Sequence, residues 1–270
     1  METNDHANQE ILLRIENALH AAARSISAFV PGTITAEYKD ANNLVTQADR
    51  IADRVLRRAL MCGGEGWLSE ESVDDFSRLN KDRVWVVDPL DGTREFVAGI
   101  PEWSISVALI ENGRPVAGGV CNPDTAETFL GAVGLGVTRN GKPVQATSCN
   151  TLSGAVVLAS RSESERGEWA CFRQSPFVIR PMGSVAYKLA LVAAGLADAT
   201  WTLVAKNEWD IAAGVALVLA GGGCVRGLEG EPLTFNKRST LVSGLVACGQ
   251  TLADDVNCFL DGHLRAARDA

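Results

Sequence analysis

Four acidic segments of the chain carry the residue types that hold divalent metal ions. The most informative is Asp88-Pro89-Leu90-Asp91-Gly92-Thr93, which follows an apolar run at 84–87. A carboxylate at the end of a buried strand is costly to desolvate unless a cation or hydrogen-bond donors compensate it. The other acidic segments hold Asp49, Glu70 and Asp210. Because carboxylate-rich sites that stay partly open to water suit Mg²⁺, these segments predict a magnesium site.

The end of the first segment adds a means of binding phosphate. Gly92 allows a ligand to approach the backbone closely, and Pro89 restricts the turn that precedes it. If a helix begins near Thr93, its free N–H groups form an anion site. The segment would then supply two oxygen ligands, Asp88 and Asp91, and a phosphate cradle. The alternative is a plain strand–turn–helix in which Asp91 only caps the helix.

Other kinds of reactive site fit the sequence less well. The segment is similar to the D-x-D-G-T turn of haloacid-dehalogenase phosphatases, but Asp91 lies three positions after Asp88 instead of two. The three His residues lie near the chain ends, so a His nucleophile is not expected. The seven Cys residues are widely spaced and form no C-x-x-C, which argues against a disulfide framework or a zinc site.

The elements that must position these residues follow from the spacing of apolar side chains. Helical spacing predicts a helix at about 8–29 and a second one after the capping residue Thr46, while 69–82 is expected to be a loop or an irregular strand end. Strands are predicted at 84–87, ending at Asp88-Pro89, and at 103–110, 115–121, 128–133 and 144–147. Their succession indicates an antiparallel sheet.

After about residue 150, strands and helices alternate. Strands are predicted at 155–159, 199–204 and 245–248, and helices begin at Ser184, Asp210 and Ala253. This change predicts an N-terminal α+β domain at 1–150 that carries most of the metal ligands. A C-terminal α/β domain at 151–270 would supply Asp210 and substrate contacts.

Composition limits the classes of partner. The chain is 46% hydrophobic and 21% charged, which is typical of a globular protein. Its formal charge of −8 is a poor match for nucleic acid or an anionic membrane. No apolar run reaches about 18 residues, and 1–10 do not resemble a signal peptide. Together with the Cys usage, these features predict a cytoplasmic protein.

Three motifs, in order, resemble the inositol monophosphatase superfamily of Mg²⁺-dependent, lithium-sensitive phosphomonoesterases. They are Glu70-Glu71-Ser72, the segment 85–93, and Trp209-Asp210-Ile211-Ala212-Ala213-Gly214. Fainter matches lie at 45–49 and at Gly183-Ser184, and the likeness extends from about residue 10 to 265. With the pattern of elements, the resemblance implies an α/β (α+β) fold arranged as a layered αβαβα sandwich. It also implies a homodimer.

The resemblance also implies roles for individual residues. One Mg²⁺ would bind Glu70, Asp88 and the carbonyl of Leu90, and a second would bind Asp88, Asp91 and Asp210. A third ion, where present, would lie near Glu70, which makes two or three ions per active site. Gly92 and Thr93 would bind the phosphate through backbone N–H groups. The catalytic residues Thr93, Asp49 and Glu70 would help activate the water that attacks in line, without a phosphoenzyme.

Within the superfamily, the chain is most similar to the CysQ-type 3′(2′),5′-bisphosphate nucleotidases. The similarity lies in Thr93-Arg94-Glu95-Phe96, in Lys188 shortly after Gly183-Ser184, and in Glu208-Trp209-Asp210. Leu203 stands where inositol phosphatases usually have an acidic residue. Arg94, Gly183, Ser184 and Lys188 are therefore expected to bind substrate, with the two cations suited to a second phosphate.

The expected reaction is hydrolysis of 3′-phosphoadenosine 5′-phosphate to AMP, so the expected partner is a small phosphate ester. Inositol 1-phosphate and histidinol phosphate remain alternative substrates, and fructose 1,6-bisphosphate is a weaker one. A non-catalytic regulatory member of the superfamily is a distant alternative, because every expected metal carboxylate is present.

Overall fold

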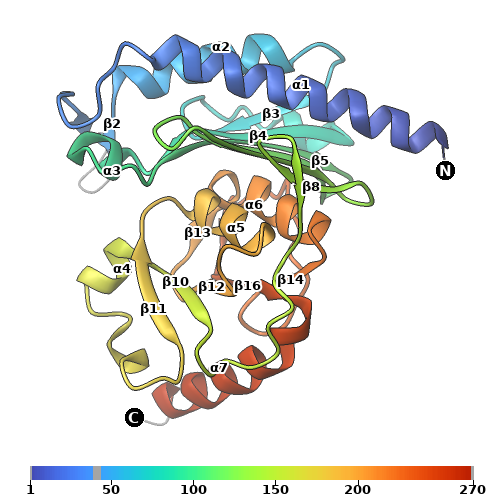
Figure 1. Cartoon of the computed structure of the whole chain (residues 1–270). Helices are drawn as coiled ribbons and strands as arrows, with labels where there is room; N and C mark the ends of the chain where they lie inside the picture. The colour runs from blue at the N-terminus through green and yellow to red at the C-terminus, as the bar shows by residue number, and fades with distance from the viewer. Residues whose placement is uncertain (1, 39–43, 269–270) are drawn as a thin grey trace.

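The computed structural model of the chain describes residues 2–38 and 44–268. Two helices, a sheet, two further helices, a second sheet and a last helix are stacked in five layers (Figure 1). This arrangement confirms the expected αβαβα sandwich.

The first layer covers the outer face of the larger sheet. It consists of α1 (Glu2–Ile26) and α2 (Gln47–Leu60). Ile15 and Leu19 of α1 and Leu56 of α2 are fully buried against the sheet residues Trp85 and Val87. Each helix places apolar residues three or four positions apart, so the side facing the sheet is continuous.

The larger sheet has seven strands in chain order. They are β3 (Gly66–Ser69), β4 (Arg83–Asp91), β5 (Ser104–Glu111), β6 (Arg114–Asn122), β7 (Glu127–Ala132), β8 (Gly136–Arg139) and β9 (Lys142–Val144). Only the pair β3–β4 is parallel; the others are antiparallel. The predicted meander is therefore correct, but the last strand ends at Val144 instead of beginning there.

The predicted end of the strand at Asp88-Pro89 is wrong. β4 continues to Asp91, which pairs with Ser104 of β5, and the register shifts between Asp88 and Asp91. Pro89 has no N–H to donate, and the irregular register accommodates it within the strand. The two carboxylates consequently stand on an irregular strand end instead of on a loop.

The middle layer consists of α5 (Val185–Ala193) and α6 (Glu208–Ala220). Both helices are buried over most of their length, as expected for elements between two sheets. They pack closely, since a Cβ placed on Gly214 would lie 2.3 Å from the Cβ of Leu189.

The second sheet has the strand order β11–β10–β12–β16–β14. The strands are β11 (Val178–Met182), β10 (Val156–Ser160), β12 (Ala199–Thr202), β16 (Leu245–Gly249) and β14 (Gly223–Arg226). Its outer face packs on α7 (Ala253–Arg268) through a cluster that contains Trp169, Phe172 and Trp201.

Shorter elements complete the described chain. They are β1 (Glu37–Tyr38), β2 (Leu44–Val45), α3 (Thr93–Ala98), α4 (Arg161–Glu165), β13 (Lys206–Asn207), β15 (Leu241–Val242) and 3₁₀ turns at Ser77–Asn80, Ala170–Phe172 and Gln250–Leu252. The domain division at 150 stays a prediction. In the structure, α6 of the C-terminal half packs on strands of the N-terminal sheet.

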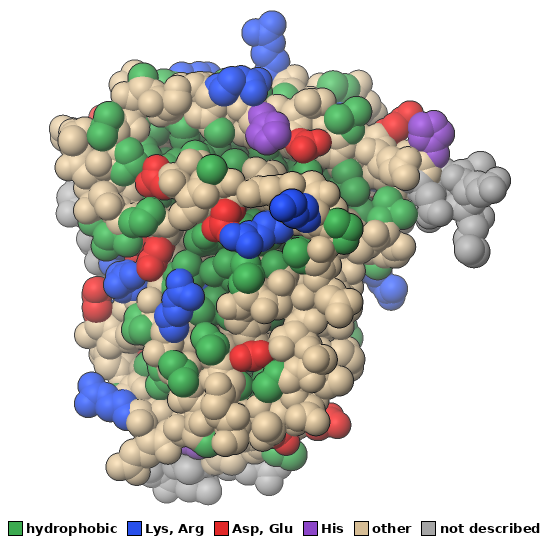
Figure 2. All heavy atoms as spheres, in the orientation of Figure 1, with side chains coloured by type: hydrophobic (Ala, Val, Ile, Leu, Met, Phe, Trp, Pro, Cys, Tyr) green, Lys and Arg blue, Asp and Glu red, His purple; other side chains and the backbone are tan. Residues whose placement is uncertain are grey.

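On the face drawn in Figure 2, acidic and basic side chains are interspersed. Among the described helices, none combines the length and the apolar character that crossing a membrane requires.

Candidate active site

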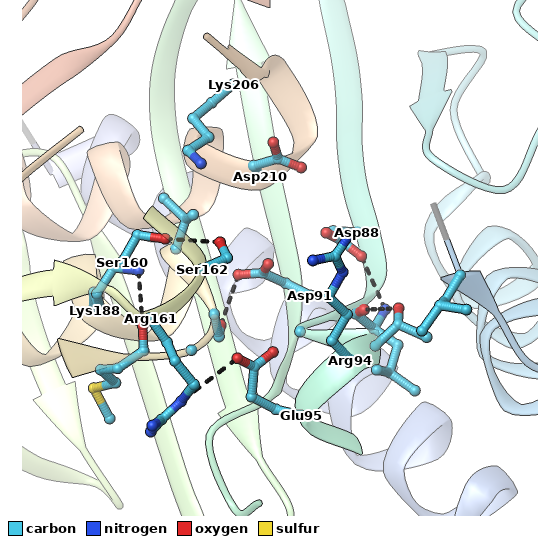
Figure 3. Close-up of a pocket in the computed structure, with 18 of the residues that line it drawn as sticks. Asp88, Asp91, Arg94, Glu95, Ser160, Arg161, Ser162, Lys188, Lys206 and Asp210 are labelled. Atoms are coloured by element: carbon cyan, nitrogen blue, oxygen red, sulfur yellow. Dashed lines mark hydrogen bonds and ion pairs between the residues drawn. The ribbon is translucent and has the colours of Figure 1, made fainter. Parts of the chain in front are cut away.

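A cavity of about 270 Å³ lies where the two sheets and the middle helices meet (Figure 3). Its walls come from the end of β4, the start of α3, the start of α4 and the first turns of α5 and α6. The residues predicted for the site that line it are Glu70, Asp88, Leu90, Asp91, Gly92, Thr93, Arg94, Gly183, Ser184, Lys188 and Asp210. Asp49 lies behind this wall and reaches it through Thr93.

Three carboxylates converge inside the cavity. One oxygen each from Glu70, Asp88 and Asp210 lies within 4.8 Å of the others. Burial raises the pKa of Asp88 well above its ordinary value, and the neighbouring carboxylates raise it further. Burial, and then the charges of Asp91 and Glu70, raise the pKa of Asp210 to about 8. Without a cation, this cluster is electrostatically unfavourable.

Local structure holds these carboxylates in place. The N–H of Leu90 donates to Asp88 Oδ1 at 2.9 Å across the irregular part of β4. Asp210 lies in the first turn of α6, where its Oδ2 accepts the N–H of Asn207 at 2.9 Å. An all-oxygen set of this kind, partly open to the cavity, fits Mg²⁺ better than a soft metal.

Asp91 lies on the adjacent wall, outside the group of three. Its Oδ2 accepts hydrogen bonds from Ser184 Oγ at 2.6 Å and from the N–H of Ala186 at 2.7 Å. Ser184 has a φ of 49°, an unusual value for a residue other than glycine. The start of α5 therefore orients Asp91 through the hydroxyl of Ser184 and the N–H of Ala186.

Gly92 is required at the start of α3. Its φ is 96°, and a Cβ there would lie 3.0 Å from the carbonyl oxygen of Glu102. Gly92 also precedes the first turn of α3, so Asp91 does not cap that helix. The predicted helix start near Thr93 is correct.

Thr93 and Asp49 are hydrogen-bonded. Thr93 Oγ1 lies 3.1 Å from Asp49 Oδ1 and 3.1 Å from the carbonyl oxygen of Leu90. The other carboxylate oxygen of Asp49 accepts the N–H of Thr46 at 2.8 Å, which caps α2. Burial raises the pKa of Asp49 against the opposing effect of these hydrogen bonds. Asp49 thus joins the capping of α2 to the orientation of Thr93.

Four basic side chains line the cavity, of which the sequence analysis named only Arg94 and Lys188. Lys188 is 3% exposed, and its Nζ donates to the carbonyl of Met182 at 3.3 Å. Burial lowers the pKa of Lys188 to about 8.

The two cations that the sequence analysis missed are Arg161 and Lys206. Arg161 is paired with Glu102 and lies 3.8 Å from Glu95. Glu102 also accepts the N–H of Gly183 at 2.8 Å, which ties the predicted Gly183-Ser184 segment to the same wall. No motif surrounds Arg161 or Lys206, so only their position in the fold reveals them.

Comparison with known proteins identifies a family that matches most of the chain. A family model described as the inositol monophosphatase family matches residues 7–258. An inositol-1-monophosphatase of Rhizobium meliloti is 35% identical over 214 residues, covering 76% of this chain and 77% of the relative. A 3′-phosphoadenosine 5′-phosphate phosphatase of Mycobacterium bovis is 33% identical over 213 residues, with the shares again 76% and 77%.

Two further similarities widen the range of relatives. The Nus factor SuhB of Pseudomonas aeruginosa is 30% identical over 249 residues, covering 86% of this chain and 89% of the relative. The crystal structure of CysQ from Bacteroides thetaiotaomicron superimposes with a TM-score of 0.76 at 26% identity, covering 90% of this chain and 98% of CysQ. These identities are too similar to one another to separate the substrates.

Proposed function

The chain belongs to the inositol monophosphatase family of phosphoric monoester hydrolases, and on that basis we propose that it converts 3′-phosphoadenosine 5′-phosphate to AMP. The observation that carries the choice of substrate is the buried ammonium of Lys188, which lines the same cavity as the carboxylate cluster. Among the described residues, Lys188 has no carboxylate at salt-bridge distance. Burying its charge is costly unless a ligand supplies an anion. A substrate with a second phosphate supplies it.

The family depends on Mg²⁺, and the residues present fit that ion. We propose that Glu70, Asp88 and the carbonyl of Leu90 hold one Mg²⁺, and that Asp88, Asp91 and Asp210 hold another. Bound there, the ions would supply positive charge to the phosphate oxygens and acidify a nearby water. The raised pKa of Asp88 supports this assignment, because a cation would relieve the repulsion that raises it.

The protein groups would position the phosphate and the attacking water. We propose that the N–H groups of Gly92 and Thr93 bind the phosphate oxygens. Thr93 Oγ1 would accept a hydrogen bond from the water and pass its own to Asp49, which lies 3.1 Å away. Glu70, at the edge of the carboxylate cluster, would complete the orientation of that water.

The remaining substrate contacts fall on the basic side of the cavity. We propose that Arg94 and Lys188 bind substrate, with Gly183 and Ser184 shaping the wall between α5 and β11. Leu203 packs beside the aromatic cluster under the second sheet and does not line the cavity. An acidic group for sugar hydroxyls is therefore not supplied at that position, which disfavours inositol phosphates.

An inositol-1-monophosphatase is the second candidate, favoured by the 35% identity to the Rhizobium enzyme. Phosphate release from 3′-phosphoadenosine 5′-phosphate, inositol 1-phosphate and histidinol phosphate, each with and without Mg²⁺, separates the candidates. We expect the bisphosphate to have the highest kcat/KM and Li⁺ to inhibit. Equal or faster turnover of inositol 1-phosphate would overturn the substrate assignment.

The metal-dependent mechanism needs its own test. Asp88→Asn should abolish Mg²⁺-dependent phosphate release, whereas Asp261→Asn, an exposed residue of α7, should leave it unchanged. Full activity of Asp88→Asn would refute the mechanism. We also propose a homodimer on the resemblance alone, and light scattering tests it. A cytoplasmic location is proposed separately, on the Cys usage and composition of the chain.

A further inference from the structure

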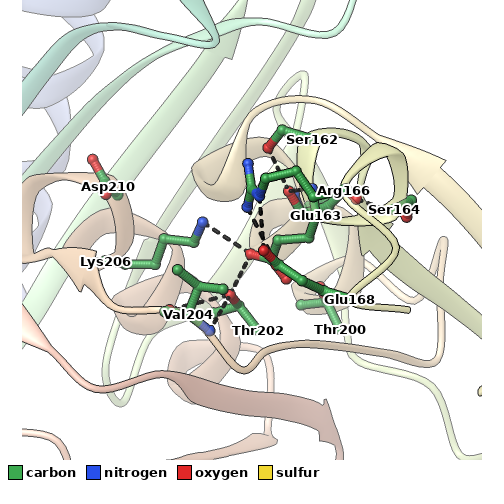
Figure 4. A network of polar contacts seen from close by, with 12 residues as sticks. Ser162, Glu163, Ser164, Arg166, Glu168, Thr200, Thr202, Val204, Lys206 and Asp210 are labelled. Carbon is green, nitrogen blue, oxygen red and sulfur yellow. Dashed lines mark hydrogen bonds and ion pairs between the residues drawn. The ribbon is translucent and has the colours of Figure 1, made fainter. Parts of the chain in front are cut away.

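Lys206 is the basic residue of the cavity that lies closest in sequence to the carboxylate cluster. It belongs to β13, where it pairs with Val242 of β15, and it lies two positions before Glu208, the first residue of α6. Figure 4 shows its side chain extending between Asp210 on one side and Glu163 on the other. Its side chain is 15% exposed, so the stem is packed while the ammonium reaches the cavity.

Glu163 holds that ammonium in place. Lys206 Nζ lies 3.0 Å from Glu163 Oε1, and Glu163 is fully buried. The carboxylate also accepts hydrogen bonds from Thr202 Oγ1 at 2.5 Å and from Trp169 Nε1 at 3.3 Å. Burial alone would raise the pKa of Glu163, but the charge of Lys206 and these donors lower it below its ordinary value. Glu163 is therefore a fixed anion with several donors.

Lys188 and Lys206 line the same cavity. Burial and the charge of Lys206 lower the pKa of Lys188 to about 8, although the carboxylates of Asp91, Glu163 and Glu95 act to raise it. Glu163 offsets one of the two ammonium groups. The charge of Arg161 is offset by Glu102, with which it is paired, and by the nearby Glu95.

Arg94 lies elsewhere in the cavity. In Figure 3 it stands beside Asp88, whereas Lys188 lies across Asp91 from it and Lys206 lies above Asp91, next to Asp210. Lys188 and Lys206 are therefore the two cations that lie away from Arg94, and Lys206 also borders the carboxylate cluster at Asp210.

We propose that Lys206 is a specificity-determining residue, which together with Lys188 binds the second phosphate of a bisphosphate substrate. Glu163 is the positioning residue that keeps the Lys206 ammonium against the cavity. This inference rests on the proposed function and deepens it, because it assigns the second phosphate to the wall formed by α5 and β13.

A purely structural role for Lys206 would be to neutralise the buried Glu163. The two roles differ in which substrates they affect. A structural role affects every substrate alike, whereas a phosphate-binding role affects only substrates with a second phosphate. Adenosine 3′-phosphate is the matched probe, since it has the same scissile phosphate and lacks the 5′-phosphate.

The experiment compares kcat and KM for 3′-phosphoadenosine 5′-phosphate and adenosine 3′-phosphate in the Mg²⁺-loaded full chain. Lys206→Met should raise KM for the bisphosphate by about 10- to 100-fold, the effect of losing a charged hydrogen bond. KM for adenosine 3′-phosphate should change less than about 3-fold, because this substrate has no second phosphate for Lys206 to bind. Lys206→Arg should restore much of the difference, and Lys142→Met, at an exposed position of β9, serves as the control.

Removing Lys206 alone leaves Glu163 buried without its cation, which can destabilise the fold. The double variant Glu163→Gln/Lys206→Met removes both charges and should recover the melting temperature of the wild-type protein while the preference for the bisphosphate stays lost. Glu163→Gln alone should raise KM for the bisphosphate to a smaller extent.

Each outcome has a defined meaning. If the wild type prefers the bisphosphate and the Lys206 variants keep that preference, or lose activity equally on both substrates, the inference is overturned and the proposed function stands. If the wild type shows no preference for the bisphosphate over adenosine 3′-phosphate, the second phosphate contributes no binding, and the choice of substrate that rests on Lys188 fails together with the assignment of Lys206.

Discussion

Replacing Asp210 with Asn should stabilise the metal-free protein. The folded chain raises the pKa of Asp210 from 3.8 to about 8, first by burial and then through Asp91 and Glu70. At pH 7 the unfolded chain releases the proton that the folded chain retains, so ionisation favours unfolding. Asn carries no charge and can still accept the N–H of Asn207, which lies 2.9 Å from Asp210 Oδ2 and caps α6.

The size of the effect follows from the same shift. At about 1.36 kcal/mol per pKa unit, the interval from 3.8 to pH 7 corresponds to about 4 kcal/mol. Asp210 is partly exposed to the cavity, where solvent screens its charge, and Asp88 can take up a proton in its place. We therefore expect a gain of about 2 kcal/mol, which is roughly 4–8 °C in Tm for a chain of this size.

The assay is thermal or urea unfolding of wild type and Asp210→Asn in EDTA, between pH 4 and pH 8. The pKa of Asp210 is raised in the folded state, so wild-type stability should fall as pH rises from about 3.8 towards about 8, and the variant should lose less. With Mg²⁺ the order should reverse. The wild type gains about 2.7 kcal/mol when the ion is at 100 times its Kd, while the variant lacks a ligand.

Asp261→Asn is the matched control, because it removes an exposed carboxylate of α7 far from the cavity. A variant Asp210→Asn that is less stable than wild type in EDTA, or that keeps the wild-type dependence on pH, would refute the electrostatic argument.

Three further predictions concern the phosphate site. Gly92→Ala should lower kcat/KM by at least about 10-fold and stability by about 1–2 kcal/mol, because φ is 96° and a Cβ would lie 3.0 Å from the Glu102 carbonyl oxygen. Gly134→Ala is the control, since Gly134 has a φ of 91° but no atom within 4 Å of a Cβ. Equal losses of phosphate release in the two variants would contradict the argument. Thr93→Val should lower kcat by about 100-fold with little change in KM, since it removes the hydroxyl that contacts Asp49. Thr93→Ser keeps that hydroxyl and should retain most of the activity. A wild-type kcat in the Val variant would exclude the assigned role. Lys188 loses its charge as pH rises through about 8, so KM for 3′-phosphoadenosine 5′-phosphate should rise above that pH while KM for adenosine 3′-phosphate follows a flatter profile. Identical profiles for the two substrates in steady-state assays would be inconsistent with Lys188 binding a second phosphate.

Short-range patterns predicted much of the fold. The apolar spacing of α1 and α2, the capping of α2 by Thr46 and the helix start at Thr93 are all correct. Such features depend on residues within a few positions of one another, which sequence periodicity records directly. The end of β4 was missed because Pro89 usually stops a strand, and only the pairing of Asp91 with Ser104 carries the strand past it.

The sequence by itself determined the chemistry at the end of β4, since Asp88, Asp91, Gly92 and Thr93 lie within six consecutive positions. Tertiary structure decided which side chains share a cavity with them. In sequence, β11, α5 and β12 lie between Glu163 and Lys206, and the two side chains meet at 3.0 Å only because α4 and β13 flank the same cavity. Lysine and glutamate usually face solvent, so neither residue stands out in a sequence. Burial beside the carboxylate cluster is the observation that marks this pair as a candidate binding group. Burial depends on the packed fold.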